Sequence, residues 1–101
     1  MVDKHQNVFT KGDALEKFSI QSISKVITTS LIFSKIGNEL WDRVGYEPSG
    51  NSFNSLVQLE NENGIPRNPF INAGALVVAD LMLEHFENPK AFLLDFVKEL
   101  T

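Results

Sequence analysis

The side chains that could carry out a reaction are those of Ser22 and Lys25, which lie three positions apart in the stretch Gln-Ser-Ile-Ser-Lys beginning at Gln21. Positions three apart share one face of a helix, so the lysine amine can reach back to the serine hydroxyl. A serine attacks poorly unless a base takes its proton, and a lysine is such a base only where burial or nearby cations favour the uncharged amine. The spacing therefore predicts a serine nucleophile and a lysine base at the start of a helix, where the Ser22 N–H could hold a developing oxyanion.

These residues also have an ordinary structural interpretation. A serine at the start of a helix is commonly an N-cap, whose hydroxyl accepts a hydrogen bond from a free backbone N–H. Two Ser-x-Asn patterns, at Ser49 and Ser52, resemble a further motif of serine enzymes, but no Lys-Thr-Gly follows them. Both lie in a stretch rich in Gly and Asn, where turn formation explains them.

Asn72 is a candidate for binding a small polar ligand. It follows Asn68-Pro-Phe-Ile71 and precedes Ala73-Gly-Ala75. A side-chain amide offers one acceptor and two donors, which suits a zwitterion or a carboxamide, and the small residues permit close approach. Capping of the next helix is the alternative role of Asn72. Arg67 could bind a carboxylate through two N–H groups, or it could form a local ion pair.

No other group of residues in the chain suggests catalysis or metal binding. His5 and His85 belong to no metal-binding motif, and a Ser-His-Asp triad would have to take its histidine from a helix face, so we expect both to be structural. The chain has no cysteine and no Gly-rich phosphate loop. We therefore expect no metal and no cofactor.

The composition indicates a soluble folded chain of limited size. The 101 residues are 43% apolar and 22% charged, which allows one domain or a piece of one. The 9 basic and 13 acidic residues give a net charge of -4 and leave no basic stripe, so we expect no nucleic acid and no membrane as partner. No stretch approaches the roughly 18 apolar residues of a spanning helix, and no signal peptide is evident. We expect a cytoplasmic protein.

The elements that must position these residues are mostly helical. Apolar residues at spacings of three and four predict a helix within 18–36 that stops at Gly37, and Trp41 is expected to anchor a short helix after it. After this short helix, Gly, Pro and Asn residues predict an irregular loop whose apolar residues anchor it to the core. The remaining predicted elements are a strand over Asn7 to Thr10, a short helix over Glu39 to Val44, the loop over Gly45 to Pro69, and helices over Ala73 to Phe86 and Lys90 to Leu100, the last preceded by Pro89.

Three ordered blocks of the sequence strongly resemble the serine-dependent glutaminase family. They are Phe18-Ser-Ile-Gln-Ser-Ile-Ser-Lys-Val26, Val44-Gly-Tyr-Glu-Pro-Ser-Gly-Asn-Ser-Phe-Asn-Ser55 and Gly64-Ile-Pro-Arg-Asn-Pro-Phe-Ile-Asn-Ala-Gly-Ala75. The resemblance extends from about Val2 to Leu83. It implies hydrolysis of L-glutamine to L-glutamate and ammonia, with Ser22 as nucleophile, Lys25 as its base, Asn72 as a substrate-binding amide and Gln21 beside Ser22 in the pocket. A homo-oligomer is the expected assembly.

The resemblance also implies an α/β (α+β) fold similar to serine β-lactamases and penicillin-binding proteins. Family members have a considerably longer catalytic domain, with further pocket residues upstream and downstream. We therefore expect residues 1–101 to be a partial domain, mainly the helical subdomain with one N-terminal strand, and to have little or no activity alone. Two alternatives are a non-catalytic helical interaction module, suggested by the apolar last helix, and a β-lactam or peptide substrate, against which the missing Lys-Thr-Gly argues.

Overall fold

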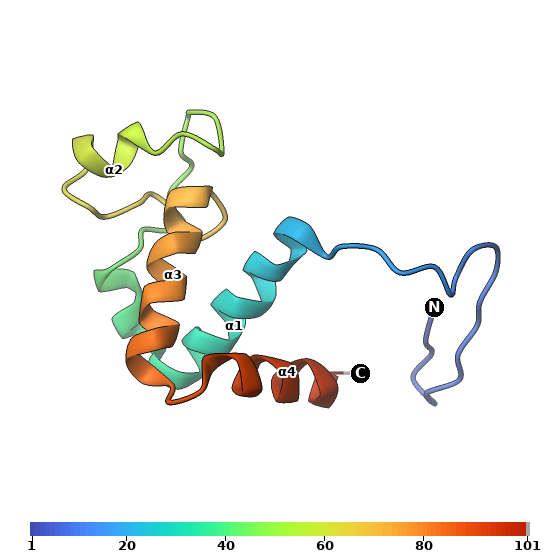
Figure 1. Ribbon diagram of the computed structural model, residues 1–101. Coiled ribbons are helices and arrows are strands. Elements are labelled where there is room, and N and C mark those ends of the chain that lie inside the picture. Colours follow the sequence, from blue (N-terminus) through green and yellow to red (C-terminus); the bar gives the residue numbers. More distant parts are fainter. Residues whose placement is uncertain (101) are drawn as a thin grey trace.

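The computed structural model describes residues 1–100, and Thr101, the last residue of the predicted partial domain, lies outside the described residues. The described residues form helices and no strand (Figure 1). In chain order the helices are η1 (Gln21–Ile23, 3-10), α1 (Ser24–Ile36), η2 (Gly37–Asp42, 3-10), α2 (Val57–Asn61), α3 (Asn72–His85) and α4 (Pro89–Leu100). The expectation of a mainly helical segment is confirmed.

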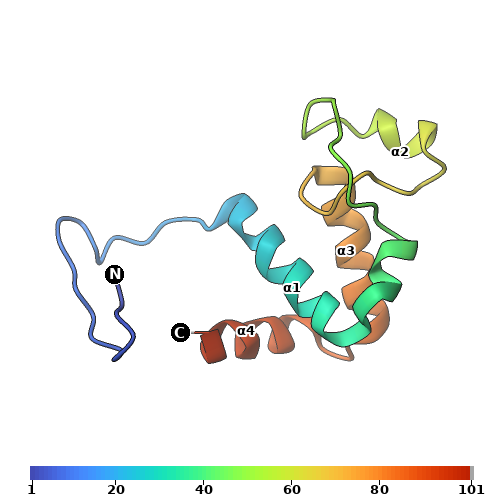
Figure 2. The ribbon, with the colours of Figure 1, turned by 180° about the vertical axis from the view of Figure 1, so that it is seen from behind.

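The first 20 residues form an arm that reaches away from the helices, as both ribbon views show (Figures 1 and 2). The predicted strand over Asn7 to Thr10 is wrong, because this stretch contributes one isolated antiparallel bridge, between Val2 and Val8. A strand needs a neighbour along its length, and the described residues supply none. The arm raises the radius of gyration to 16.0 Å, above the roughly 13 Å of a compact domain of about 100 residues.

The core lies where α1, η2, α3 and α4 meet. Trp41 is partly buried against this cluster and its ring centroid lies 5.8 Å from that of Phe33, so the predicted anchor is in place. Buried apolar side chains make up the cluster: Leu31, Ile32, Leu40, Val44, Val78, Leu81, Met82 and Phe86. Burial of this set supplies the main stabilisation, at roughly 1.5–3 kcal/mol for each large side chain.

Local sequence signals place several helix ends correctly. Helix α1 stops at Gly37, as predicted, and the φ of 58° at this residue suits glycine. Helix α4 begins at Pro89, one residue before the predicted start at Lys90. The predicted first helix starts too early, because residues 18–20 are not helical. Ile23, in the turn before α1, is 60% exposed and so does not pack in the core. The predicted short helix over 39–44 is instead the 3-10 helix η2, shifted toward Gly37.

The loop that follows η2 is held mainly by polar contacts, and the prediction that its apolar residues anchor it is wrong for all of them except Leu59, which is partly buried. The large apolar residues Phe53, Leu56, Val57, Ile65 and Phe70 are all exposed, and the loop contains the unpredicted helix α2. Two backbone pairs join its ends, from Gly45 N to Pro66 O and from Glu47 N to Arg67 O, each at 2.8 Å.

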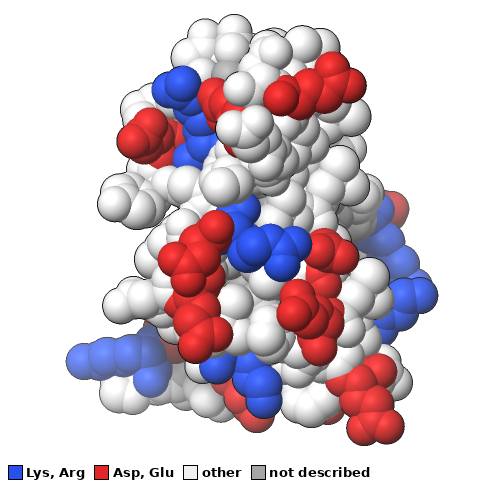
Figure 3. All heavy atoms as spheres, turned by 90° about the vertical axis from the view of Figure 1, so that its left-hand side faces the viewer, with Lys and Arg blue, Asp and Glu red and all other residues white. Residues whose placement is uncertain are grey.

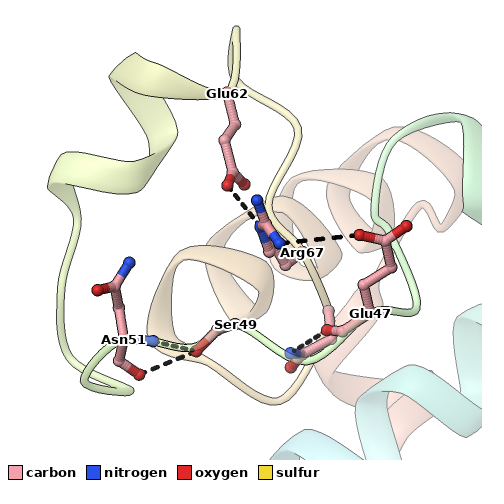
Figure 4. A network of polar contacts seen from close by, with 6 residues as sticks. Glu47, Ser49, Asn51, Glu62 and Arg67 are labelled. Carbon is pink, nitrogen blue, oxygen red and sulfur yellow. Dashed lines mark hydrogen bonds and ion pairs between the residues drawn. The ribbon is translucent and has the colours of Figure 1, made fainter.

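Arg67 ties this loop together, as Figure 4 shows. Its Nε donates to Glu62 Oε1 at 2.6 Å, and one terminal nitrogen lies 3.9 Å from Glu47 Oε2. The hydrogen bond and charge of Glu62 raise the pKa of the Arg67 guanidinium. Of the two predicted roles for Arg67, the local ion pair is therefore the one realised.

Charges of both signs are interspersed on the face drawn in Figure 3. Arg43, at the end of η2, lies 2.9 Å from Asp80 Oδ2 and 3.6 Å from Glu84 Oε2, both on α3. These exposed pairs each contribute about 0–1 kcal/mol. They hold η2 against α3 beside the apolar core. Among the helices of residues 1–100, none is both long and apolar enough to cross a membrane.

Gly74 allows the loop to approach the start of α3. A Cβ at this position would lie 1.9 Å from the Asn68 carbonyl oxygen and 2.7 Å from the Pro69 Cα. Both are backbone atoms, which cannot move without shifting the loop. The absence of a side chain at residue 74 therefore sets the distance between residues 68–71 and α3.

We expect Gly74→Ala to destabilise the protein by at least about 2 kcal/mol, because the added methyl group overlaps backbone. Helix propensity alone predicts the opposite sign, a gain of about 1 kcal/mol. Urea unfolding followed by circular dichroism measures the difference. The matched control, Ala79→Gly at an exposed position of α3, should lose only about 1 kcal/mol. A Gly74→Ala variant as stable as the parent would contradict the close-approach explanation.

Candidate active site

The candidate residues gather where α1 and α3 begin. Ser22 lies in η1, Lys25 in the first turn of α1, and Asn72 at the first position of α3. An open pocket of about 370 Å³ lies beside them and is lined by Gln21, Ser22, Ser24, Lys25, Thr28, Ala75 and Ala79. The structure thus brings Gln21, Ser22 and Lys25 together, as the sequence predicts, and adds small residues of α3 as the opposite wall.

Lys25 connects the two helices. Its Nζ donates to Asn72 Oδ1 at 2.6 Å and to the backbone carbonyl of Phe70 at 3.0 Å. An uncharged amine has two N–H groups and one lone pair. If both N–H groups bind these acceptors, the lone pair remains for a third partner on the pocket side. The two contacts are therefore compatible with a base as well as with a structural ammonium.

Asn72 has a different role from the predicted helix cap. The N-cap position of α3 is Ile71, and no side chain caps that end. The Asn72 amide oxygen accepts from Lys25, while its backbone N–H donates to Phe53 O at 2.8 Å. Asn72 also lines a neighbouring pocket formed with Asn54, Leu56, Ala75 and Leu76.

The side chain that orders the approach to α3 is Asn68. Its Oδ1 accepts from the backbone N–H groups of Phe70 at 3.0 Å and Ile71 at 3.2 Å. Its Nδ2 donates to Glu47 O at 2.9 Å. The sequence signal for this role was the Asn-Pro pair, which favours turns. Through these bonds Asn68 fixes the Phe70 carbonyl that Lys25 contacts.

Ser22 is exposed and lies inside η1, so the N-cap interpretation of this serine is wrong. The structure gives its hydroxyl no hydrogen bond within residues 1–100, and Ser22 and Lys25 meet only as walls of one pocket. The preceding residue, Gln21, has a φ of 46°, which non-glycine residues seldom adopt. Such a conformation costs on the order of 1–3 kcal/mol and is common at functional sites.

The strained turn is fixed by Ser24, whose hydroxyl donates to Gln21 O at 2.6 Å. This bond presents Ser22 at the pocket mouth. Arg67, the remaining candidate for ligand binding, does not join the site, because it is paired with Glu62 and Glu47. Within the described part of the chain, no cluster of three His, Cys, Asp or Glu residues could hold a metal ion.

Sequence reasoning missed two contributors to the site, the Phe70 carbonyl and Phe53. The Phe53 ring centroid lies 5.9 Å from Lys25 Nζ, and its carbonyl binds the Asn72 N–H. Neither contributor could be recognised from a sequence motif. The Phe70 carbonyl is a backbone group, and Phe53 lies in a loop, 28 positions from Lys25 in α1. The site is thus a pocket with an exposed serine hydroxyl and a fixed amine, and the amide that binds this amine lines the neighbouring pocket. Such a set is suited to attack on a carbonyl carbon.

Comparison with known proteins gives a consistent result. A family model described as Glutaminase matches residues 1–101. The glutaminase of Christiangramia forsetii is 57% identical over 96 residues, which cover 95% of this chain and 32% of that protein. The glutaminase of Saccharophagus degradans is 60% identical over 90 residues, which cover 89% of this chain and 29% of that protein. The glutaminase of Aliivibrio salmonicida is 58% identical over 95 residues, covering 93% and 31%.

The chain spans about a third of the length of these curated relatives. No solved structure is significantly similar to it. The family match covers the whole chain, including the final helix, where sequence blocks alone gave no resemblance. The family predicted from the three blocks is thereby confirmed: this chain belongs to the glutaminase family.

Proposed function

We propose that this chain forms part of the active site of an enzyme that hydrolyses L-glutamine to L-glutamate and ammonia. The observation that carries the proposal is the placement of Lys25, which shares a pocket with Ser22 while its Nζ is fixed by Asn72 and the Phe70 carbonyl. The family match supplies the substrate. A serine nucleophile, a nearby lysine base and an amide for binding are the groups that acyl transfer needs at its centre.

In the proposed first step, Ser22 Oγ attacks the side-chain carboxamide carbon of glutamine and its proton passes to Lys25 Nζ. The resulting oxyanion is held partly by the Ser22 N–H at the positive end of the helix. Collapse breaks the C–N bond, and Lys25 returns the proton to the leaving nitrogen as ammonia. The product is a glutamyl ester of Ser22.

In the second step, water attacks this ester carbonyl. Lys25 takes a proton from the water as a second tetrahedral intermediate forms. Collapse of this intermediate breaks the ester C–O bond and releases glutamate, while Lys25 returns the proton to Ser22 Oγ and so restores the hydroxyl. Asn72 binds the substrate through the donor groups of its amide, because its oxygen is occupied by Lys25. Gln21 lines the pocket beside the nucleophile.

We further propose that the site is completed by protein outside residues 1–101. The relatives are about three times as long as this chain, and the pocket is open. On this proposal the complete protein has a β-lactamase-like fold, of which this chain is the helical part, and the chain alone hydrolyses little or no glutamine. We propose that the complete protein is a cytoplasmic homo-oligomer that acts on free glutamine and has no nucleic acid or membrane partner.

Replacing Ser22 with Ala in the complete protein should lower ammonia release from glutamine by at least about 10³-fold, because the nucleophile is lost. Coupled detection of ammonia and glutamate measures the rate, and circular dichroism checks folding. The matched control is Ser30→Ala, since the Ser30 hydroxyl is exposed on α1 and bonds only Val26 O of its own helix. Turnover by the Ser22→Ala variant at the parental rate would refute the nucleophile assignment.

Replacing Asn72 with Asp should lower turnover by about 10²-fold or more at neutral pH. A carboxylate in place of the amide oxygen, 2.6 Å from Lys25 Nζ, would favour the charged ammonium, which cannot take the serine proton. The change keeps the size and shape of the side chain. Steady-state kinetics in the complete protein test it, and an Asn72→Asp enzyme with unaltered kcat would show that Lys25 is not the base.

A second candidate function is a non-catalytic interaction module, which the apolar surface of α4 favours. Leu94 and Leu100 of this helix are 61% and 65% exposed, and Phe92 is half exposed. Calorimetric titration of the complete protein with glutamine separates the two functions. Self-association or partner binding without glutamine binding would favour the module, and saturable glutamine binding favours the enzyme.

A further inference from the structure

We propose that Phe53 is a positioning residue for Lys25, acting through its aromatic ring on the amine and through its backbone carbonyl on Asn72. The inference rests on the proposed function, because it assigns Phe53 a role in the same site. It comes from two contacts of Phe53, one with each member of the hydrogen-bonded pair Lys25 and Asn72. Phe53 lies in the irregular loop, far in sequence from both partners.

The ring contact places an aromatic face beside the Lys25 amine. The Phe53 ring centroid lies 5.9 Å from Lys25 Nζ, inside the about 6 Å over which such pairs attract. The amine already binds Asn72 Oδ1 and Phe70 O, which fix it from the α3 side. The ring adds a third, apolar neighbour. It limits the rotamers of a side chain with four rotatable bonds and excludes water from one side of the nitrogen.

The backbone contact fixes the other member of the pair. Asn72 N donates to Phe53 O at 2.8 Å, so the first residue of α3 is bound to the loop. Because the Asn72 side chain begins at the same Cα, this bond also orients the amide toward Lys25. Phe53 therefore contacts both ends of the hydrogen bond between Lys25 and Asn72.

A local turn holds Phe53 in place. The Ser52 hydroxyl donates to Asn54 Oδ1, and Ser55 N donates to Ser52 O at 3.0 Å. The residues on both sides of Phe53 are thus bonded to each other across it. The Ser-Phe-Asn-Ser stretch, which the sequence allows as either a serine-enzyme motif or a turn, acts here as the turn that presents the ring.

The proposed role is separable from folding. Phe53 is 62% exposed, so the ring contributes little to the core. Exchange for Leu keeps the backbone carbonyl and apolar bulk but removes the aromatic face, whereas exchange for Tyr keeps the face. The pair of variants isolates the ring contact from the backbone contact.

In the complete protein, Phe53→Leu should lower kcat for glutamine about two- to fivefold with KM changed less than twofold, because the Lys25 amine loses the flat face that limits its rotamers and is less well placed for proton transfer. Phe53→Tyr should stay within about twofold of the parent. The control is Phe9→Leu, the same change at an exposed phenylalanine of the N-terminal arm that does not line the pocket. It should leave kcat unaltered. Equal losses in the Leu and Tyr variants, or no loss in either, would overturn the proposal.

A second readout does not depend on activity. An aromatic ring shifts the NMR resonances of nearby protons, so the Lys25 ε-methylene protons should move toward their random-coil position in Phe53→Leu and stay near the parental position in Phe53→Tyr. No movement in Phe53→Leu would overturn the proposal even if the enzyme is active. Movement in a complete protein that does not hydrolyse glutamine would support the contact while rejecting the proposed function.

Discussion

The hydrogen bond from Lys25 Nζ to Asn72 Oδ1 is the interaction on which the site depends. It joins the first turn of α1 to the first residue of α3 across 47 positions of sequence, at 2.6 Å. A contact this short between a flexible lysine and an amide requires both helix ends to be fixed beforehand, because ordering such a side chain costs up to about 2 kcal/mol. The remaining structure can be understood as the means of fixing those two ends.

The α3 end is fixed by backbone proximity. Gly74 lets the Asn68 carbonyl lie against the helix, and Asn68 in turn binds the N–H groups of Phe70 and Ile71. The Phe70 carbonyl then lies where Lys25 can donate to it. The α1 end is fixed by the core below it and by the strained turn at Gln21, which Ser24 closes.

The parts of the fold and of the site that could be predicted from the sequence are those set by neighbouring residues. Gly37 and Pro89 mark helix ends through the conformations that their own backbones allow, and the three-residue spacing of Ser22 and Lys25 placed both in one pocket. The role of Asn72 could not be predicted from the sequence. A helix cap can be predicted from the adjacent residues, but the bond of Asn72 to Lys25 depends on how segments 47 positions apart pack together. The strand over residues 7–10 failed for the same reason, since a strand is defined by its partner.

The surroundings of the amine bear on the proposed role of Lys25 as a base. A lysine takes a proton from serine only where its uncharged form is favoured, and removal of water is the main cause of that preference. Here Lys25 is partly exposed, Ser22 is exposed, and the pocket between them is open. Apolar side chains beside the site, among them Ile20 and Val26, also face solvent. On the proposed function, any contact that covered them would bury apolar area and desolvate the amine at once, and so would both stabilise the protein and favour the uncharged base.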